Sequence, residues 1–362
     1  MSESEIVPVW QQPDRYDMAT RADRRLLYRL EAAGTEKVLR VHEIADELFE
    51  LNHPDKTTDT VARERFGAPI VRQGDKYGKW FYFPWSDQLV QYPDEADYRE
   101  LLTFRNRELI TMEEQRKLGA ATLACVGLSV GSHIVLQAAH SGIGDTMILA
   151  DPDVVSIMNL NRIHAGMTAV GMRKTDLVGI AVSELNPYIK QVHLPEGITP
   201  GSAKKLMKYQ PDLLYEHVDH LPTKVLLRRL ARQAGIPLIM ATDVGDRSLI
   251  DIERYDLGDA RPFLGKLNDE ELDALEKDMV PADQKLRFVN KIIGEENMSP
   301  RMVRSMSRIG ISLGGIAQLS TTAGAGGAYA VVAGREILLA RGPASGRYSM
   351  SAQDILHIPD VS

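Results

Sequence analysis

Short apolar runs and helix-like spacing of apolar residues alternate along the middle of the chain. Apolar runs over residues 121–126 and 146–150 predict strands, and residues 132–141 between them predict a helix. The same alternation then predicts a helix over 174–185, strands over 192–194 and 212–215, a helix over 223–234 and a strand over 237–241. Strands that alternate with helices favour a mostly parallel sheet with helices on both faces. We therefore expect an α/β, Rossmann-like domain over residues 101–362.

Residues 1–100 have a different pattern and are expected to form a separate domain. Apolar residues recur at helical spacing over Asp23–Leu39 and Val41–Leu51. The aromatic-rich run Tyr77–Tyr92 predicts a β-hairpin. Helices followed by a hairpin resemble a small α+β module of the winged-helix type. Two interpretations of its aromatic residues remain open: they fill the core of the module, or they help it to bind a peptide strand or a nucleic acid.

Two later segments add detail to the larger domain. Residues 268–300 are charged and helix-prone, which predicts a helical insertion with a solvated face. Gly310–Leu339 is rich in small residues, which let backbones pack closely. We expect irregular chain there, leading into a buried helix that could also lie at a subunit interface.

Composition narrows the range of functions. The chain has 362 residues, a formal net charge of -7 and one cysteine, Cys125. Its length suggests two domains, and its acidity argues against a nucleic-acid partner. One cysteine excludes a disulfide framework and a multi-cysteine metal site, so no zinc is expected. The acidic first residues and the lack of a long apolar run predict no signal peptide, no membrane partner and a cytoplasmic location.

The first candidate for chemistry is the loop Gly127-Leu128-Ser129-Val130-Gly131, which follows the first strand of the larger domain. Glycines there let the backbone approach a phosphate, and the start of the next helix offers free N–H groups and a positive dipole end. Asp151 ends the next strand, where a carboxylate can bind the hydroxyls of a ribose. On these features alone, a dinucleotide-dependent dehydrogenase and an ATP-dependent enzyme both fit.

The residues after Asp151 favour ATP. Asp153, Asn159, Arg162 and Lys174 follow the same strand and bring carboxylate, amide and cationic groups together. A triphosphate needs this much positive charge, whereas a redox cofactor does not, and carboxylates can hold the accompanying Mg²⁺. The pattern therefore predicts ATP and Mg²⁺ as the bound groups.

The run from Asp151 to Arg162 resembles the D-x-D-x-V-x-x-x-N-L-x-R signature of the ThiF/MoeB superfamily, whose fold is that of ubiquitin-activating enzymes. The resemblance extends from about Thr103 to Leu339. Its other matching segments, in chain order, are Phe104–Glu108, Glu114–Leu118, Ser141–Gly144, Asp212–Asp219 and Ala323–Leu339. Several motifs in the right order are far more specific than a glycine loop alone.

This resemblance implies adenylation, in which a substrate carboxylate attacks the α-phosphorus of ATP to give acyl-AMP and pyrophosphate. It also implies a homodimer in which catalytic residues come from both subunits. The residues it assigns are the loop glycines Gly127 and Gly131, Asp151 at the ribose with Asp153 following it, Asn159, Arg162 and Lys174 at the triphosphate, Asp219 at Mg²⁺, and Arg107 reaching the phosphates from the partner subunit.

The chain also departs from the pattern of the superfamily. Ser129 and Val130 stand where glycines are usual, and the paired Cys-x-x-Cys zinc motifs are missing. Cys125 lies inside a predicted strand, as a small core residue would, so we expect no enzyme thioester. His217 and His220 flank Asp219, where either could assist proton transfer, although a structural role is favoured.

Members of the superfamily without a cysteine step include the maturation enzymes of microcin C and pantocin, which act on ribosomal peptides and carry an N-terminal peptide clamp. The order of domains here resembles that branch. It implies a peptide substrate, activated at its C-terminus or a Glu/Asp side chain, as in antibiotic biosynthesis, with direct attack by another nucleophile. The N-terminal module would then bind a leader peptide. The alternatives are a small-molecule or tRNA-linked carboxylate, a non-catalytic nucleotide-binding scaffold, and a dehydrogenase.

Overall fold

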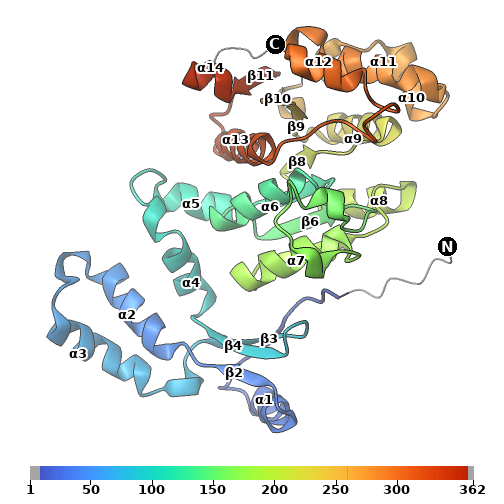
Figure 1. The fold of residues 1–362 in the computed structure, drawn as a ribbon. Helices are drawn as coiled ribbons and strands as arrows, with labels where there is room; N and C mark the ends of the chain where they lie inside the picture. Colours follow the sequence, from blue (N-terminus) through green and yellow to red (C-terminus); the bar gives the residue numbers. More distant parts are fainter. Residues whose placement is uncertain (1–8, 259, 358–362) are drawn as a thin grey trace.

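The computed structural model describes residues 9–258 and 260–357, which contain two β-sheets (Figure 1). The smaller sheet has the strand order β1-β3-β4-β2, and the larger has the order β11-β10-β9-β8-β5-β6-β7. The strands are β1 (Asp14–Tyr16), β2 (Glu36–Val38), β3 (Lys79–Phe83), β4 (Gln88–Tyr92), β5 (Thr122–Val126), β6 (Thr146–Ala150), β7 (Lys190–Leu194), β8 (Leu213–Glu216), β9 (Leu238–Val244), β10 (Arg247–Glu253) and β11 (Gly346–Ser351).

Helices surround both sheets. They are α1 (Arg21–Ala33), α2 (Val41–Asn52), α3 (Thr60–Val71), α4 (Glu95–Leu102), α5 (Met112–Gly119), α6 (Gly131–His140), α7 (Lys174–Leu185), α8 (Pro200–Lys208), α9 (Leu221–Ala234), α10 (Asp269–Glu276), α11 (Ala282–Ile293), α12 (Pro300–Met306), α13 (Ser320–Leu338) and α14 (Ala352–Leu356). Within the described ranges, no helix is both long and apolar enough to cross a membrane.

Five strands of the larger sheet, β5 to β9, run parallel, which confirms the predicted α/β class. The antiparallel strands β10 and β11 extend this sheet and were not predicted. The prediction ended β9 at Ala241, because the polar pair Thr242-Asp243 follows the apolar run. In the structure these two polar residues continue the strand.

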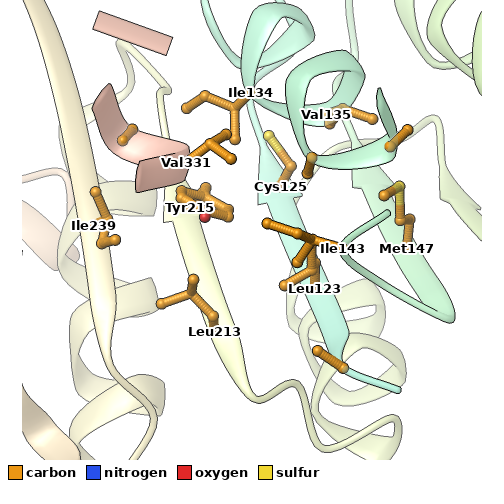
Figure 2. Close-up of a cluster of buried hydrophobic side chains, with 14 of the residues drawn as sticks. Leu123, Cys125, Ile134, Val135, Ile143, Met147, Leu213, Tyr215, Ile239 and Val331 are labelled. Atoms are coloured by element: carbon orange, nitrogen blue, oxygen red, sulfur yellow. The ribbon is translucent and has the colours of Figure 1, made fainter. Parts of the chain in front are cut away.

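The core of the larger domain has two layers. On one face of the sheet, α6, α7 and α13 pack on a cluster that includes Leu123, Cys125, Ile134 and Tyr215, which Figure 2 shows side by side. On the other face, α8, α9 and α10 cover a second apolar cluster. Strands buried on both faces explain why the sequence shows continuous apolar runs and not alternation.

The N-terminal module follows the order α1, β2, α2, α3, β3, β4, with β1 added at the sheet edge. The prediction of one helix from Asp23 to Leu39 was wrong at its end, because Gly34 adopts a left-handed φ of 101° that ends α1. The predicted hairpin is present as β3 and β4. Its residues Trp80, Phe81 and Phe83 are buried, so these aromatic side chains serve packing.

The module is attached to the larger domain mainly through α7. Trp85 Nε1 donates to Glu184 Oε1 at 2.7 Å, and the Tyr92 hydroxyl donates to the Glu184 carbonyl at 2.9 Å. At the other end of the helix, the Val9 N–H donates to Asp176 Oδ2 at 2.9 Å. Trp10 continues this N-terminal contact by stacking on His193 of β7. The helix that begins with Lys174 is therefore held at both ends by N-terminal residues.

The later segments form helices and irregular chain. Helices α10 and α11 form the charged insertion, and Leu272 and Leu275 of α10 enter the core. The glycine-rich chain before Ser320 is irregular, and α13 then packs on the sheet through a face of small residues. Gly334 of that face comes so close to Tyr215 that a Cβ would overlap its ring hydroxyl.

A fully buried ionic cluster joins the sheet to α9. Arg228 donates to Glu216 of β8 and to Glu253 of β10, each at 2.8 Å. Lys224, one turn earlier, also donates to Glu216 at 2.9 Å. Burial alone would raise the pKa of Glu216, but Lys224 and Arg228 hold it at about 2. The carboxylate is therefore ionised throughout the working pH range.

We expect replacement of Arg228 by methionine to lower the free energy of unfolding by about 3–5 kcal/mol, because buried Glu253 would lose its cation and Glu216 would keep only Lys224. Denaturant unfolding followed by circular dichroism measures this loss. The matched control is Arg229→Met: Arg229 is the exposed neighbour that pairs with Asp273 and Glu276. Its loss should cost at most about 1 kcal/mol. Equal losses in the two variants would contradict the assigned role of Arg228.

Candidate nucleotide-binding site

The carboxyl ends of parallel strands lie at one edge of a sheet, where ligands bind in folds of this class. The glycine loop follows β5 and Asp151 follows β6. Asp219 follows β8, and Asp243 lies near the end of β9. The topology therefore gathers three carboxylates and the loop at the same edge of the larger sheet.

The loop is shaped by close backbone contacts. Gly127 has a φ of 91°, and a Cβ there would overlap the backbone of His217. A Cβ on Gly131 would lie 2.8 Å from Cys125 Sγ, so the first turn of α6 also requires a glycine. The two glycines that the sequence retains are those that packing demands. Ser129 takes part through its side chain, because it accepts a hydrogen bond from Arg162 Nε at 3.2 Å.

Asp151 ties the loop to the segment that follows β6. Its Oδ2 accepts the Leu128 N–H at 2.6 Å, and its Oδ1 accepts the Asp153 N–H at 2.8 Å. Lys174 Nζ donates to Asp153 Oδ2 at 2.7 Å and lies 3.7 Å from Asp151 Oδ1. Burial raises the pKa of Asp151, and Lys174 opposes this. Three of the predicted residues are thus brought together as an ion-paired cluster.

Arg162 stands between the loop and two further carboxylates. Besides Ser129, its guanidinium donates to the Met158 carbonyl and to Asn161 Oδ1, both at 2.9 Å. Burial lowers the pKa of Arg162, whereas the charges of Asp219 and Asp243 act to raise it. The side chain is therefore fixed by neutral oxygens, while both carboxylates lie close enough for their charges to act on it.

Two residues that the sequence assigns to the triphosphate, Asn159 and Arg107, contact other parts of the chain. Asn159 Oδ1 accepts the Ser156 N–H at 3.1 Å and closes a short turn beside Arg162. Arg107 donates to Glu100 at 3.2 Å and lines a cavity of about 530 Å³ with Gly119 and Asp145, which precede β5 and β6. Arg107 is thus at the opposite edge of the sheet from the loop, and a single chain does not bring it to the site.

The histidines and the cysteine have structural contacts. His217 Nδ1 donates to the Ala241 carbonyl at 3.0 Å, and burial lowers the pKa of His217 to about 4. His220 bonds Thr223 in the first turn of α9. Cys125 lies in the core, where burial raises the pKa of its thiol (Figure 2). These surroundings favour the structural interpretation of all three residues.

Asp243 is the feature that the sequence analysis missed. Only 5% of the residue is exposed, and neither carboxylate oxygen has a hydrogen-bond partner among the described residues. Burial raises the pKa of Asp243 to about 7, and Arg162 opposes this. The signal that could have found it is the one used for Asp151, namely a carboxylate at the end of an apolar run.

These features place the chain among the nucleotide-binding α/β folds, with a glycine loop before a helix and carboxylates at the strand ends. Residues 103–249 match the model of the ThiF family. An uncharacterized protein of Mycobacterium tuberculosis is 36% identical over 74% of this chain and 37% of its own length. A tRNA threonylcarbamoyladenosine dehydratase of Bacillus subtilis is 30% identical over 43% of this chain and 61% of its own length.

The chain therefore spans less than two thirds of each of these relatives. Among solved structures, PaaA aligns with a TM-score of 0.49 and 18% identity, covering 72% of this chain and 69% of that one. Escherichia coli MccB in complex with MccA aligns with a TM-score of 0.48 and 19% identity, covering 66% of this chain and 63% of that one.

Replacement of Asp243 by asparagine should alter the pH dependence of stability. The pKa of this carboxyl is about 7 in the folded chain and 3.8 in its ordinary state, so the folded state binds the extra proton between these values. The contribution of Asp243 to wild-type stability should therefore fall as the pH rises from about 5 to 7 and then level off. Asparagine cannot ionise. The melting temperature of the variant, relative to that of the wild type, should therefore rise as the pH increases over this window. A constant difference between pH 5.5 and pH 8 would contradict this expectation.

We also expect the single thiol to be unreactive in the folded protein, because the thiolate is the reactive form and Cys125 is buried. A chromogenic disulfide reagent should detect no thiol under native conditions and one thiol per chain in denaturant. Rapid reaction of the native protein would show that Cys125 is accessible and would reopen a covalent role.

Proposed function

We propose that this protein uses ATP to adenylate a substrate carboxylate, without forming an enzyme thioester. The observation that carries the proposal is the arrangement of Asp151, Asp153, Lys174 and Arg162 around the glycine loop of the segment that matches the ThiF family. The burial of Cys125 supports the absence of a thioester step.

The residues present fit a magnesium-bound triphosphate. The first turn of α6 presents backbone N–H groups beside the loop, and Arg162 and Lys174 supply positive charge on either side of it. Asp219 is exposed and close to Arg162, as a ligand of the metal should be. Magnesium at Asp219 would neutralise charge on the phosphates. On binding, Lys174 would exchange part of its pairing with Asp153 for the phosphates, while Asp151 keeps the loop in place.

We further propose that the carboxylate belongs to a ribosomally made peptide and that the N-terminal module binds its leader. The short edge strands β1 and β2 offer backbone groups for an added peptide strand. The solved structures of MccB include one with MccA, which supports a peptide as the substrate class to test first. A tRNA-linked carboxylate remains the second candidate, because a tRNA threonylcarbamoyladenosine dehydratase is among the relatives.

We propose a cytoplasmic homodimer in which Arg107 of one subunit reaches the site of the other. The side chain lies on the surface of the cavity at the amino ends of β5 and β6, where a second subunit could take it up. Because Arg107 lies at the opposite edge of the sheet from its own glycine loop, a role at the phosphates requires a second chain.

Saturating Mg·ATP should raise the melting temperature, because a ligand that binds only the folded state stabilises it by mass action. At about 100 times Kd the gain is about 2.7 kcal/mol, or roughly 5 °C for a domain of this size. The rise should be small in Asp219→Asn and Lys174→Ala. Asp212→Asn is the matched control, because Asp212 precedes β8 at the opposite edge of the sheet and should leave the rise intact.

The comparison ligands are NAD and Mg·ADP, and candidate peptides are then screened for pyrophosphate release. A rise with NAD but not with Mg·ATP would replace this proposal with a dehydrogenase. No rise with either nucleotide would favour the scaffold interpretation.

A further inference from the structure

Arg162 is bound at both its side chain and its main chain by the segment that contains the glycine loop. At the side chain, Arg162 Nε donates to Ser129 Oγ at 3.2 Å. At the main chain, the Arg162 carbonyl accepts a hydrogen bond from His133 Nε2 at 2.6 Å. Ser129 lies in the loop, and His133 lies in the first turn of α6. The loop and the helix therefore hold this arginine through two separate contacts.

The residues that make these contacts belong to one compact turn. Ser132 Oγ donates to the Ser129 carbonyl at 2.7 Å, and the His133 N–H donates to the Val130 carbonyl at 3.0 Å. The start of a helix presents N–H groups that suit a phosphate. The distance between these N–H groups and the Arg162 guanidinium therefore depends on the bonds from Ser129 and His133.

The His133 ring holds the carbonyl as a neutral donor. A carbonyl oxygen only accepts hydrogen bonds, so Nε2 carries the ring proton. Burial lowers the pKa of His133, and the charge of His164 lowers it further, although the bond to Arg162 acts to raise it. The ring is therefore neutral near pH 7 and adds no second positive charge beside Arg162.

Two neighbours restrict the position of His133. A Cβ on Gly327 of α13 would lie 2.6 Å from His133 Cβ, so the helix backbone passes directly against this residue. The ring of His164 meets the His133 ring edge-on, with centroids 4.9 Å apart. Only 7% of His133 is exposed. A side chain restricted in this way can keep its hydrogen-bond partner in one place.

We propose that His133 is a positioning residue that holds Arg162 where the triphosphate of ATP binds. The proposal rests on the proposed function for the triphosphate and adds a residue that sets its binding geometry. Cations and N–H groups fixed in advance stabilise developing charge well, because they need no rearrangement during the reaction. The irregular loop then has a role: Ser129 binds the side chain of Arg162, and His133 binds its main chain.

The first test measures Mg·ATP affinity of the full chain by isothermal titration calorimetry. His133→Leu removes the donor, whereas His133→Gln keeps an N–H near the place of Nε2. We expect His133→Leu to weaken Mg·ATP binding about fivefold, which corresponds to the loss of about one hydrogen bond. His133→Gln should restore most of this affinity. The matched control is His140→Leu in the exposed last turn of α6, which should bind as the wild type does.

Adenosine separates the positioning of Arg162 from a general loss of structure, because it lacks the phosphates. Its affinity should be the same in His133→Leu and in the wild type, whereas a disordered site would bind both ligands less tightly. If His133→Leu does not fold, His133→Asn takes its place. The shorter asparagine does not reach the carbonyl, so it should show the same loss of Mg·ATP affinity.

The second test reads the contact in the free protein by hydrogen exchange and mass spectrometry. Residues 156–166 around Arg162 should exchange faster in His133→Leu than in the wild type, and at the wild-type rate in His133→Gln. Faster exchange in a protein whose wild type does not bind Mg·ATP would support the contact and overturn the proposed function.

Four results would overturn the positioning role. They are unchanged exchange in His133→Leu, an unchanged Mg·ATP affinity in that variant, an equal loss in His133→Gln, and a parallel loss of affinity for adenosine.

Discussion

The fully buried contact between Glu216 and Arg228 is the interaction on which the geometry of the site depends. It joins β8 to α9, and through Glu253 it reaches β10 as well. Glu216 Oε1 also accepts the Val218 N–H at 2.9 Å, which fixes the turn that carries His217 and Asp219. The backbone of His217 in turn sets the space available to Gly127. One ionic contact thus determines where the glycine loop and the candidate metal ligand stand relative to each other.

The polar groups of the site fall into two kinds. Asp151, Asp153 and Lys174 are satisfied by one another, so this half keeps its shape without a ligand. Asp243 and His217 Nε2 have no partners among the described residues, so the other half is incomplete by itself. Arg162 contacts the glycine loop through Ser129 and is affected by the charge of Asp243.

The sequence predicts the parallel part of the fold well. The bounds of β6 and α7 are those expected, because an apolar run ends in Asp151 and helical spacing begins at Lys174. Strand β10 was missed because the polar end of β9 hides the continuation of the sheet. The buried role of Arg228 was missed because nothing in helical spacing separates it from exposed Arg229.

The candidate site was predicted in part for a related reason. A contiguous motif carries Asp151 to Lys174, so pattern alone can assemble them. Asp243 belongs to no such run, and its importance comes from the absence of a partner in three dimensions. Its place behind an apolar run could mark it as a candidate, but only the folded chain shows that the carboxylate has no partner among the described residues.

The attachment of the N-terminal module to α7 has a thermodynamic consequence. Lys174 begins this helix, and N-terminal residues contact it at Asp176 and at Glu184. A ligand on the module that changes the free energy of this helix therefore also affects Lys174, its first residue. Such coupling is reciprocal. If a ligand on the module changes the affinity for the nucleotide by some factor, the nucleotide changes the affinity of the module for that ligand by the same factor. If the module and the nucleotide site each bind a ligand as proposed, the helix couples the two affinities, and a change in one alters the other.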